Sequence, residues 1–261
     1  MRIATWNVNS VKAHFIAVTD WLKEAKPDVV CLQEIKCESP SFPNADMEAL
    51  GYQCAVHGQK TYNGVAILSR LPLDDIRAGL PGDDTDEHAR FIEATVIDGA
   101  HAVRVASLYL PNGNPAPGPK YEYKLSWMER LRKHAQHLLK QEDAFVLAGD
   151  YNVIPCSRDA KNPKNWRDDA LFLPQTRIAF EELSNLGLTE AFRALHPLDD
   201  GAYSFWDYQA GAWPKNNGIR IDHLLLSPQA ADQLVAVEIH RHVRGWEKPS
   251  DHVPVMIELR T

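Results

Sequence analysis

The sequence has few cysteines and lacks the patterns that would tie the chain to a membrane or to a disulfide scaffold. Its 261 residues include four cysteines and no CxxC pair, and a chain of this length can bury a core without cross-links. No apolar run approaches the roughly 20 residues of a membrane helix. No basic stretch followed by an apolar one opens the chain, so no signal peptide is expected. We therefore expect reduced thiols, a cytoplasmic protein and no membrane partner.

Motifs of several large enzyme classes are also missing. The chain lacks GxSxG of many serine hydrolases, GxGxxG and the Walker A loop of nucleotide-binding sites, and HExxH of zinc proteases. It also lacks an excess of positive charge, because 35 acidic residues against 28 basic ones leave a net charge of −7. A chain that is basic overall is excluded, but a local cationic face for nucleic acid is not.

Short runs rich in Val, Ile and Leu alternate with amphipathic stretches, which is typical of a mixed α/β chain. The runs predict strands at residues 2–7, 29–34, 64–69, 92–97, 103–109, 144–148, 221–226, 235–239 and 253–259. Apolar residues spaced three or four apart predict helices at 11–25, after Ser10 as N-cap, and at 125–138 and 179–186. The stretches 111–119 and 157–169 are expected to be long loops. No composition break marks a linker, so we expect one domain over residues 1–261, with sheets packed face to face and helices outside.

Polar side chains interrupt or follow several of the apolar runs, at positions that the core of a strand would not tolerate. Asn7 and Asn9 share one face of a strand, as do Asp150 and Asn152. The remaining polar residues of this kind are Glu34, Asp222, Asp251 and His252. Each residue alone is typical of a turn, a helix cap or a loop anchor. Together they predict one polar rim formed by several strand ends.

A rim of carboxylates requires a counter-charge. Carboxylates close together repel one another and raise each other's pKa, and a divalent cation removes that cost. Oxygen ligands without a cysteine pair favour Mg²⁺ or Mn²⁺ over zinc. Such a cation beside carboxylates and an imidazole suits phosphate ester hydrolysis, in which the metal neutralises phosphate oxygens and a base activates water.

A set of short motifs occurs in the order found in a known family, at residues 5–9, 32–34, 63–67, 109–111, 149–152, 203–208, 220–222 and 250–255. With these motifs the chain resembles the exonuclease III family of DNA-repair nucleases, which includes the class II apurinic/apyrimidinic (AP) endonucleases. That family belongs to the wider endonuclease/exonuclease/phosphatase superfamily. The resemblance covers essentially the whole chain and implies a four-layer αββα sandwich, with two mixed β-sheets packed face to face between helices.

The resemblance implies a Mg²⁺-dependent (or Mn²⁺-dependent) DNA phosphodiesterase without a nucleotide cofactor. Such an enzyme acts on double-stranded DNA as a 3′–5′ exodeoxyribonuclease, cleans blocked or recessed 3′ ends and incises 5′ to abasic sites. We expect a monomer. The balance of exonuclease and AP endonuclease activity, which the loop 156–175 should influence, stays open, as does the number of metal ions.

The resemblance also implies roles for the polar rim. Metal ligands are implied at Glu34, with Asn7 and Asp251 nearby, and for a second ion at Asp150, Asn152 and His252. Asp150 would orient or deprotonate the attacking water. Asn152 and Asn7 would donate hydrogen bonds to the phosphate, and Tyr109 would contact the phosphate or assist the leaving oxygen.

The imidazole of His252 would face the scissile phosphate. Adjacent residues of a strand point to opposite faces, so Asp222 rather than Asp251 is predicted to orient this ring. Whether His252 acts as a neutral base or as a cation stays open.

Two further sets of residues follow from the resemblance. A small apolar pocket, which excludes a nucleotide that still carries its base, is implied at Phe205, Trp206, Ile219 and Ile221. Contacts to the DNA backbone are expected from cations in or beside the two long loops: Lys120, Lys124, Arg158, Lys161, Lys164 and Arg167.

Two other functions stay open at this point. The same fold can hydrolyse a lipid or inositol phosphate, although residues 205–206 and 220–222 are of the DNA-enzyme type and no amphipathic membrane-binding stretch is present. A non-catalytic regulator that binds RNA or DNA would not need the metal and base residues, all of which are present here.

Overall fold

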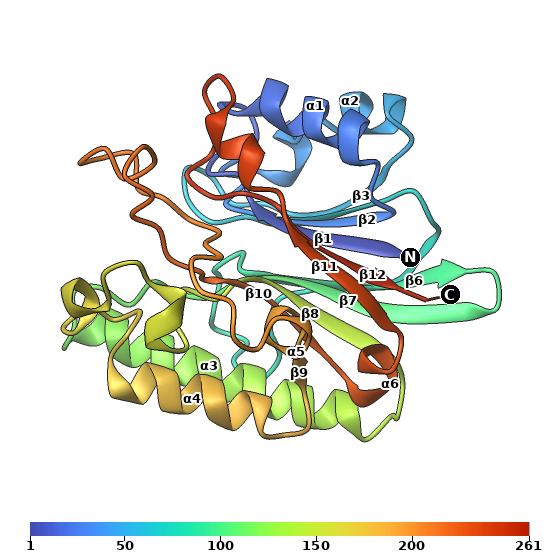
Figure 1. Ribbon diagram of the computed structural model, residues 1–261. Coiled ribbons are helices and arrows are strands. Elements are labelled where there is room, and N and C mark those ends of the chain that lie inside the picture. The colour runs from blue at the N-terminus through green and yellow to red at the C-terminus, as the bar shows by residue number, and fades with distance from the viewer. Residues whose placement is uncertain (261) are drawn as a thin grey trace.

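Two six-stranded mixed sheets lie face to face in the middle of the molecule, and helices cover the outer side of each (Figure 1). The computed structural model describes residues 1–260. The first sheet has the order β11 (Leu234–Ile239), β12 (Val255–Leu259), β1 (Arg2–Asn7), β2 (Val29–Gln33), β4 (Val65–Ser69) and β3 (Gln53–His57). The second has the order β5 (Leu73–Ala78), β6 (Phe91–Asp98), β7 (His101–Tyr109), β8 (Phe145–Asp150), β10 (Asp222–Leu226) and β9 (Thr189–Glu190).

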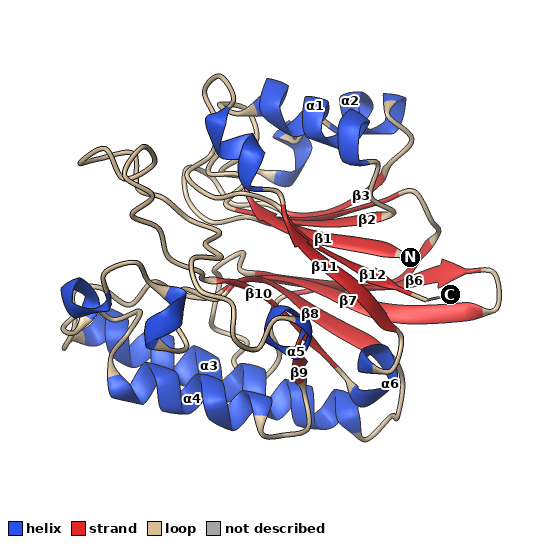
Figure 2. Cartoon of the chain, viewed as in Figure 1, coloured by secondary structure: helices blue, strands red, loops and turns tan. Residues whose placement is uncertain are grey.

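The helices complete the four layers (Figure 2). Over the first sheet lie α1 (Phe15–Ala25) and α2 (Asn44–Ala49), and over the second lie α3 (Pro119–Leu139) and α4 (Pro174–Ser184). The short α5 (Ala191–Leu195) and α6 (Pro228–Ala231) pack against β10. This is the αββα sandwich that the family resemblance implied. Among residues 1–260, no helix combines the length and the apolar character required to cross a membrane.

The inner faces of the two sheets share one apolar core. Ile3 of the first sheet belongs to the same buried cluster as Val146 and Leu224 of the second. The outer faces are buried as well, since Trp6 of β1 packs edge-on against Trp21 of α1 with ring centroids 5.5 Å apart. Because both faces of the central strands are covered, these strands read as continuous apolar runs rather than alternating ones.

The strand directions decide where the polar strand ends meet. The pairs β1–β2 and β7–β8 are parallel, so the carboxyl ends of the two strands in each pair lie together. β10 runs antiparallel to β8 and places Asp222, its first residue, opposite Asp150, the last residue of β8. β12 runs antiparallel to β1 and follows the segment that contains His252.

All the predicted strands are present, with small shifts at their ends: β8 continues to Asp150, and β12 begins at Val255. The sequence patterns missed β3, β5 and β9, because β5 is a polar, largely exposed edge strand and β9 has only two residues. Helix α1 begins at Phe15, later than predicted. The Ser10 hydroxyl accepts the N–H of Ala13 at 3.2 Å and so caps a separate turn before the helix.

Candidate active site

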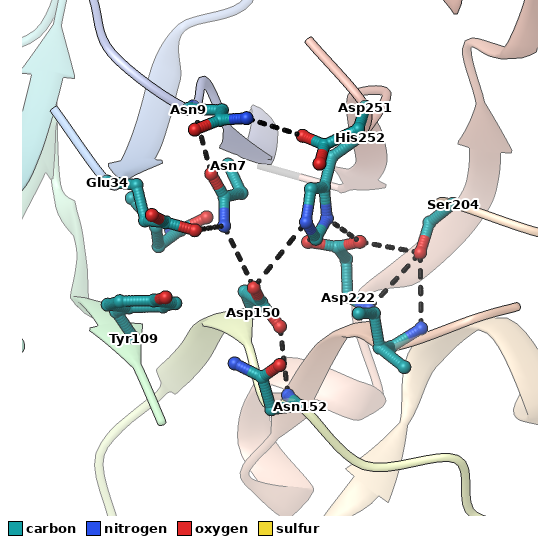
Figure 3. Close-up of polar contacts among 12 residues, drawn as sticks. Asn7, Asn9, Glu34, Tyr109, Asp150, Asn152, Ser204, Asp222, Asp251 and His252 are labelled. Carbon is teal, nitrogen blue, oxygen red and sulfur yellow. Dashed lines mark hydrogen bonds and ion pairs between the residues drawn. The ribbon is translucent and has the colours of Figure 1, made fainter. Parts of the chain in front are cut away.

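The polar residues of the strand ends meet at one end of the sandwich, and Asn7 joins the two sheets there (Figure 3). Its Nδ2 donates to Glu34 Oε1 at 2.8 Å and to Asp150 Oδ2 at 2.9 Å, while its Oδ1 accepts the N–H of Asn9 at 3.0 Å. Both amide hydrogens of Asn7 are therefore used by carboxylates. In this geometry the Asn7 side chain orients Glu34 and Asp150, and the predicted hydrogen bond from Asn7 to a phosphate stays a prediction that would require one of these two contacts to be exchanged.

Glu34 follows β2 and is held in its ionised form. Its carboxylate lies 3.0 Å from Lys36 Nζ and accepts the hydrogen bond from Asn7. Burial alone would raise the pKa of Glu34, but the Lys36 ammonium and the Asn7 amide outweigh it and lower this pKa below its usual value. Sequence patterns gave Lys36 no role, although it stands two residues after Glu34.

His252 is buried between two carboxylates. Its Nδ1 lies 2.9 Å from Asp222 Oδ2, and its Nε2 lies 3.7 Å from Asp150 Oδ2. The predicted contact with Asp222 is thus confirmed. Burial would lower the pKa of His252, but the charges of Asp222 and Asp150 prevail and raise it to about 10.

Asp222 is itself held in place by a residue that the sequence patterns missed. The buried Ser204 hydroxyl donates to Asp222 Oδ2 at 2.6 Å and accepts the N–H groups of Ile221 and Asp222 at 3.2 Å each. Ser204 lies in the motif at residues 203–208, which was the only signal in the sequence for its importance. The Ser204–Asp222–His252 series fixes the orientation of the imidazole.

Asp150 stands at the centre of the site and is almost fully buried. Burial and the negative charge of Asp222 raise the pKa of Asp150, while the positive charge of His252 lowers it. Together they raise this pKa to about 7. One carboxylate oxygen faces Asn7 and the other accepts the N–H of Asn152 at 2.9 Å. In the protein alone, Asp150 and His252 therefore compete for a proton.

The donor set at this end of the sandwich fits a hard divalent cation. Asp150, Asp222 and His252 each place one ligand atom within 4.8 Å of the others. Asp222 already bonds to the imidazole through both oxygens. The carboxylates of Asp150 and Glu34 accept hydrogen bonds but keep further lone pairs for a cation, and only one oxygen of Asp251 is hydrogen-bonded. Buried carboxylate oxygens that repel one another are the ligands that Mg²⁺ and Mn²⁺ accept.

Tyr109 ends β7 beside Glu34 (Figure 3). Burial and the charges of Glu34 and Asp150 raise the pKa of its phenol well above the usual value, so the hydroxyl is a neutral hydrogen-bond donor. The Arg90 guanidinium stacks 4.8 Å from the ring centroid, and its Nη1 donates to the Tyr109 carbonyl at 3.2 Å.

Asp251 and its neighbours form the rim of the site above Asn7. The Asp251 carboxylate accepts the Asn9 amide at 3.1 Å, and Lys36 contacts the Asn9 side-chain oxygen. Ser250 donates to the Asn7 carbonyl at 2.7 Å, which ties this segment to β1.

The predicted apolar pocket is only partly assembled as expected. Phe205, Ile219 and Ile221 lie in one apolar cluster, and the Phe205 ring lies 4.9 Å from the ring of His252. Trp206 does not belong to it, and its assignment to the pocket was wrong. Its side chain is fully buried in the core between the first sheet and α1, and its ring centroid lies 5.0 Å from that of Trp213. Successive residues of an extended segment point to opposite sides, so Trp206 faces away from Phe205.

Five of the six cations predicted to contact DNA are exposed. They are Lys120, Arg158, Lys161, Lys164 and Arg167. Lys124 was predicted wrongly, because its side chain is completely buried and its Nζ donates to the carbonyl oxygens of Asn112 at 3.0 Å and Asn152 at 2.6 Å. The burial lowers the pKa of Lys124 to about 7 despite the nearby Asp150 and Asp169.

Comparisons with known proteins agree with this geometry. The model of the Endonuclease/Exonuclease/phosphatase family matches residues 4–252. Exodeoxyribonuclease III of Haemophilus influenzae is 32% identical to the chain over 267 aligned residues that cover 100% of both. The 3′–5′ exonuclease NExo of Neisseria meningitidis superposes with a TM-score of 0.94 at 36% identity, and an AP endonuclease of Archaeoglobus fulgidus with 0.93 at 35%, each over 100% of both chains. NExo was also solved as a 3′ phosphatase bound to a product DNA hairpin.

The chain belongs to the Endonuclease/Exonuclease/phosphatase family. Within this family it groups with the exonuclease III-type proteins, as the order of its motifs indicated, and it is a hydrolytic nuclease. A cluster of buried acidic residues with one histidine is in keeping with a metal-dependent member.

Proposed function

We propose that the chain is a divalent-metal-dependent DNA-repair phosphodiesterase. Its activities would be 3′–5′ exodeoxyribonuclease and 3′-end cleaning on duplex DNA, and incision 5′ to abasic sites. The observation that carries the proposal is the series of contacts from Glu34 through Asn7 and Asp150 to His252, which spans both sheets. The names exodeoxyribonuclease III, 3′ phosphatase and AP endonuclease among similar proteins support DNA as the substrate.

Mg²⁺, or Mn²⁺ in its place, is the proposed cofactor. Glu34 would hold it, with Asn7 and Asp251 nearby, and Asp150, Asn152 and His252 would hold a second ion if one binds. The bound cation would neutralise phosphate oxygens and favour deprotonation of water. Support comes from the oxygen-rich donor set and from the ionised Glu34.

The buried carboxylate of Asp150 is the proposed acceptor of the proton from the attacking water. Its oxygens point into the site from the end of β8, and Asn7 and the Asn152 N–H fix both of them. Without a second ion, the negative charges of Asp222 and Asp150 would keep the His252 imidazole protonated. The imidazolium would then face the phosphate and stabilise the negative charge of the transition state.

Asn152 and Tyr109 are the proposed neutral donors to the phosphate. One amide hydrogen of Asn152 donates to the Leu110 carbonyl at 2.9 Å, which leaves the second for a phosphate oxygen. The neutral phenol of Tyr109 would donate to the phosphate or to the leaving oxygen.

Three broader features are proposals as well. A single domain is supported by the core that the two sheets share. Monomeric action is supported by a site built wholly from this chain. A cytoplasmic location is supported by the four free cysteines.

Cleavage assays test this function. With Mg²⁺, the purified chain should cleave duplex DNA that carries an abasic analogue, a 3′-phosphate or a recessed 3′ end. Glu34→Gln or Asp150→Asn should reduce the rate by about 100-fold or more, whereas Asp84→Asn, an exposed loop control, should not change it. Full activity in excess chelator would contradict the metal-dependent mechanism.

The same assays decide between substrates. Turnover of sphingomyelin or an inositol phosphate in preference to every DNA substrate would contradict the proposed specificity. Tight RNA or DNA binding without cleavage under any divalent ion would instead indicate a binding protein.

A further inference from the structure

We propose that Lys124 is a positioning residue that braces the two catalytic loops and thereby holds Asn152 in place. This inference rests on the function proposed above for Asn152, because Lys124 would act through that residue.

The Lys124 ammonium joins two loops that are far apart in the sequence. It projects from the first turns of α3, and its Nζ donates to the carbonyl of Asn112 at 3.0 Å and to that of Asn152 at 2.6 Å. Asn112 lies in the loop after β7, the strand that ends at Tyr109, and Asn152 lies in the loop after β8, the strand that ends at Asp150. One buried amino group therefore fixes the distance between the loops that follow both catalytic strand ends.

Asn152 adopts a backbone conformation that needs such support. Its φ of +47° lies in the left-handed region, which asparagine tolerates better than most residues, particularly when its side chain bonds locally, but at a higher energy than glycine. The residue is held at its N–H by Asp150, at its side chain by the Leu110 carbonyl and by Asn112 Nδ2 at 3.2 Å, and at its carbonyl by Lys124. Without the ammonium, the carbonyl loses the shortest of these hydrogen bonds.

The loop after β7 is packed directly against the lysine stem. Gly113 has a φ of +90°, and a Cβ at this position would lie 2.6 Å from Lys124 Cδ and 3.2 Å from Ala170 Cβ. The stem thus packs closely against Gly113, and the buried Lys124 side chain has no exposed surface with which to contact DNA. A buried ammonium needs several hydrogen-bond acceptors, and here catalytic-loop carbonyls provide them.

The test is a double-mutant cycle that combines Lys124→Met with Asn152→Ala. Lys124→Met keeps the apolar stem and removes the charge. In single-turnover assays at saturating DNA, Lys124→Met alone should slow cleavage by about tenfold or more. In the Asn152→Ala background, the same substitution should slow cleavage by less than about twofold, because the effects of coupled residues are not additive. The DNA dissociation constant and its salt dependence, measured without a divalent ion that supports cleavage, should stay unchanged.

Two further variants keep the test decisive. Lys124→Gln removes the amino group but keeps a polar side chain, and it should show the same non-additivity with Asn152→Ala if Lys124→Met does not fold. Lys133→Met, on the exposed side of the same helix, is the matched control and should cleave at the wild-type rate.

Three outcomes would overturn the inference. Equal losses from Lys124→Met in both backgrounds would indicate a general structural role. A weaker affinity with a salt slope reduced by about one would indicate a phosphate contact. Wild-type cleavage by Asn152→Ala alone would contradict the proposed role of Asn152 and with it the Lys124 inference, whereas the first two outcomes would overturn the Lys124 inference and leave the role of Asn152 standing.

Discussion

At the scale of single residues, the ring of His252 lies between two carboxylates that differ in what they do. Asp222 contacts Nδ1 at 2.9 Å and is itself held by Ser204, so it orients the ring. Asp150 lies 3.7 Å from Nε2 and is held by Asn7, so it is positioned for its proposed role as the acceptor of a proton from water. The two acids have different roles because their hydrogen-bond partners differ.

Replacing Asp222 tests this division. Asp222→Asn should lower kcat by about 100-fold or more, because an amide neither stabilises the charged imidazole nor fixes its orientation. The pKa of His252 should fall, since one of the two charges that raise it is gone. Steady-state kinetics give the first effect, and NMR titration of the His252 imidazole gives the second.

Ser204→Ala is the graded control for that variant. It removes one hydrogen bond to Asp222 but keeps the charge, so the loss in kcat should be smaller and the pKa of His252 should stay raised. Wild-type kcat in Asp222→Asn would contradict the role assigned to this pair.

At the scale of elements, the long loop after β8 is fastened to β9, α5 and β10 by a buried group of charges. Asp159 Oδ1 accepts from Arg193 Nη2 at 2.6 Å and from Arg220 Nε at 2.8 Å. Arg220 Nη1 also donates to Glu190 Oε1 at 2.8 Å. Burial would raise the pKa of both acids, but the charge of Arg220 outweighs it and lowers each to about 2. Arg220 lies between Ile219 and Ile221 in the sequence, so its ion pairs also hold the backbone from which these two pocket residues project.

The lowered pKa of Asp159 predicts how stability depends on pH. Because the folded-state pKa lies below the unfolded-state value of about 3.9, the stabilisation is present above that value and is lost as the pH falls towards 2. Asp159→Asn should therefore lower the free energy of unfolding near pH 7 by on the order of 2 kcal/mol. The difference from the wild type should shrink below pH 4, as measured by urea unfolding at several pH values.

Asp84→Asn is the control for this experiment, since Asp84 is exposed on the loop between β5 and β6. Its unfolding curve should follow that of the wild type at every pH. A gap between Asp159→Asn and the wild type that stays constant from pH 7 to pH 3 would show that the Asp159 charge is not the stabilising factor.

At the scale of the whole molecule, a chain with a net charge of −7 must approach a polyanion through a local cationic face. The loop after β8 carries exposed Lys161, Lys164 and Arg167. We expect the triple alanine variant of these residues to bind duplex DNA more weakly. Its slope of log affinity against log salt should be shallower by up to about three, since each phosphate contact contributes about 0.9. Anisotropy titrations at several salt concentrations measure both.

A second triple variant with the same change in net charge distinguishes local phosphate contacts from the overall electrostatic field of the protein. The alanine triple at Lys23, Lys133 and Lys140 removes three exposed cations from the helical layers. It should leave the salt slope close to that of the wild type. Equal slopes in the two triple variants would contradict a cationic contact face on the loop after β8.

Individual residues show which features of the structure the sequence patterns could predict and which they could not. The apolar run at residues 29–34 predicted a strand that ends at Glu34, and β2 ends one residue earlier, at Gln33. The alternation rule predicted the contact between Asp222 and His252. The same reasoning failed for Lys124, because composition places a lysine near a loop on the surface, whereas the loops after β7 and β8 close over it.

The sequence by itself determined nine of the twelve strands, the polar residues at their ends and the family, because apolar periodicity and motif order are local properties of the chain. Only the tertiary structure decided that Asn7 uses both amide hydrogens on carboxylates, that Ser204 holds Asp222 and that Trp206 faces away from the pocket. Those hydrogen bonds join residues separated by up to 143 positions in the sequence. They depend on which strands pair and in which direction, and no local pattern encodes that geometry.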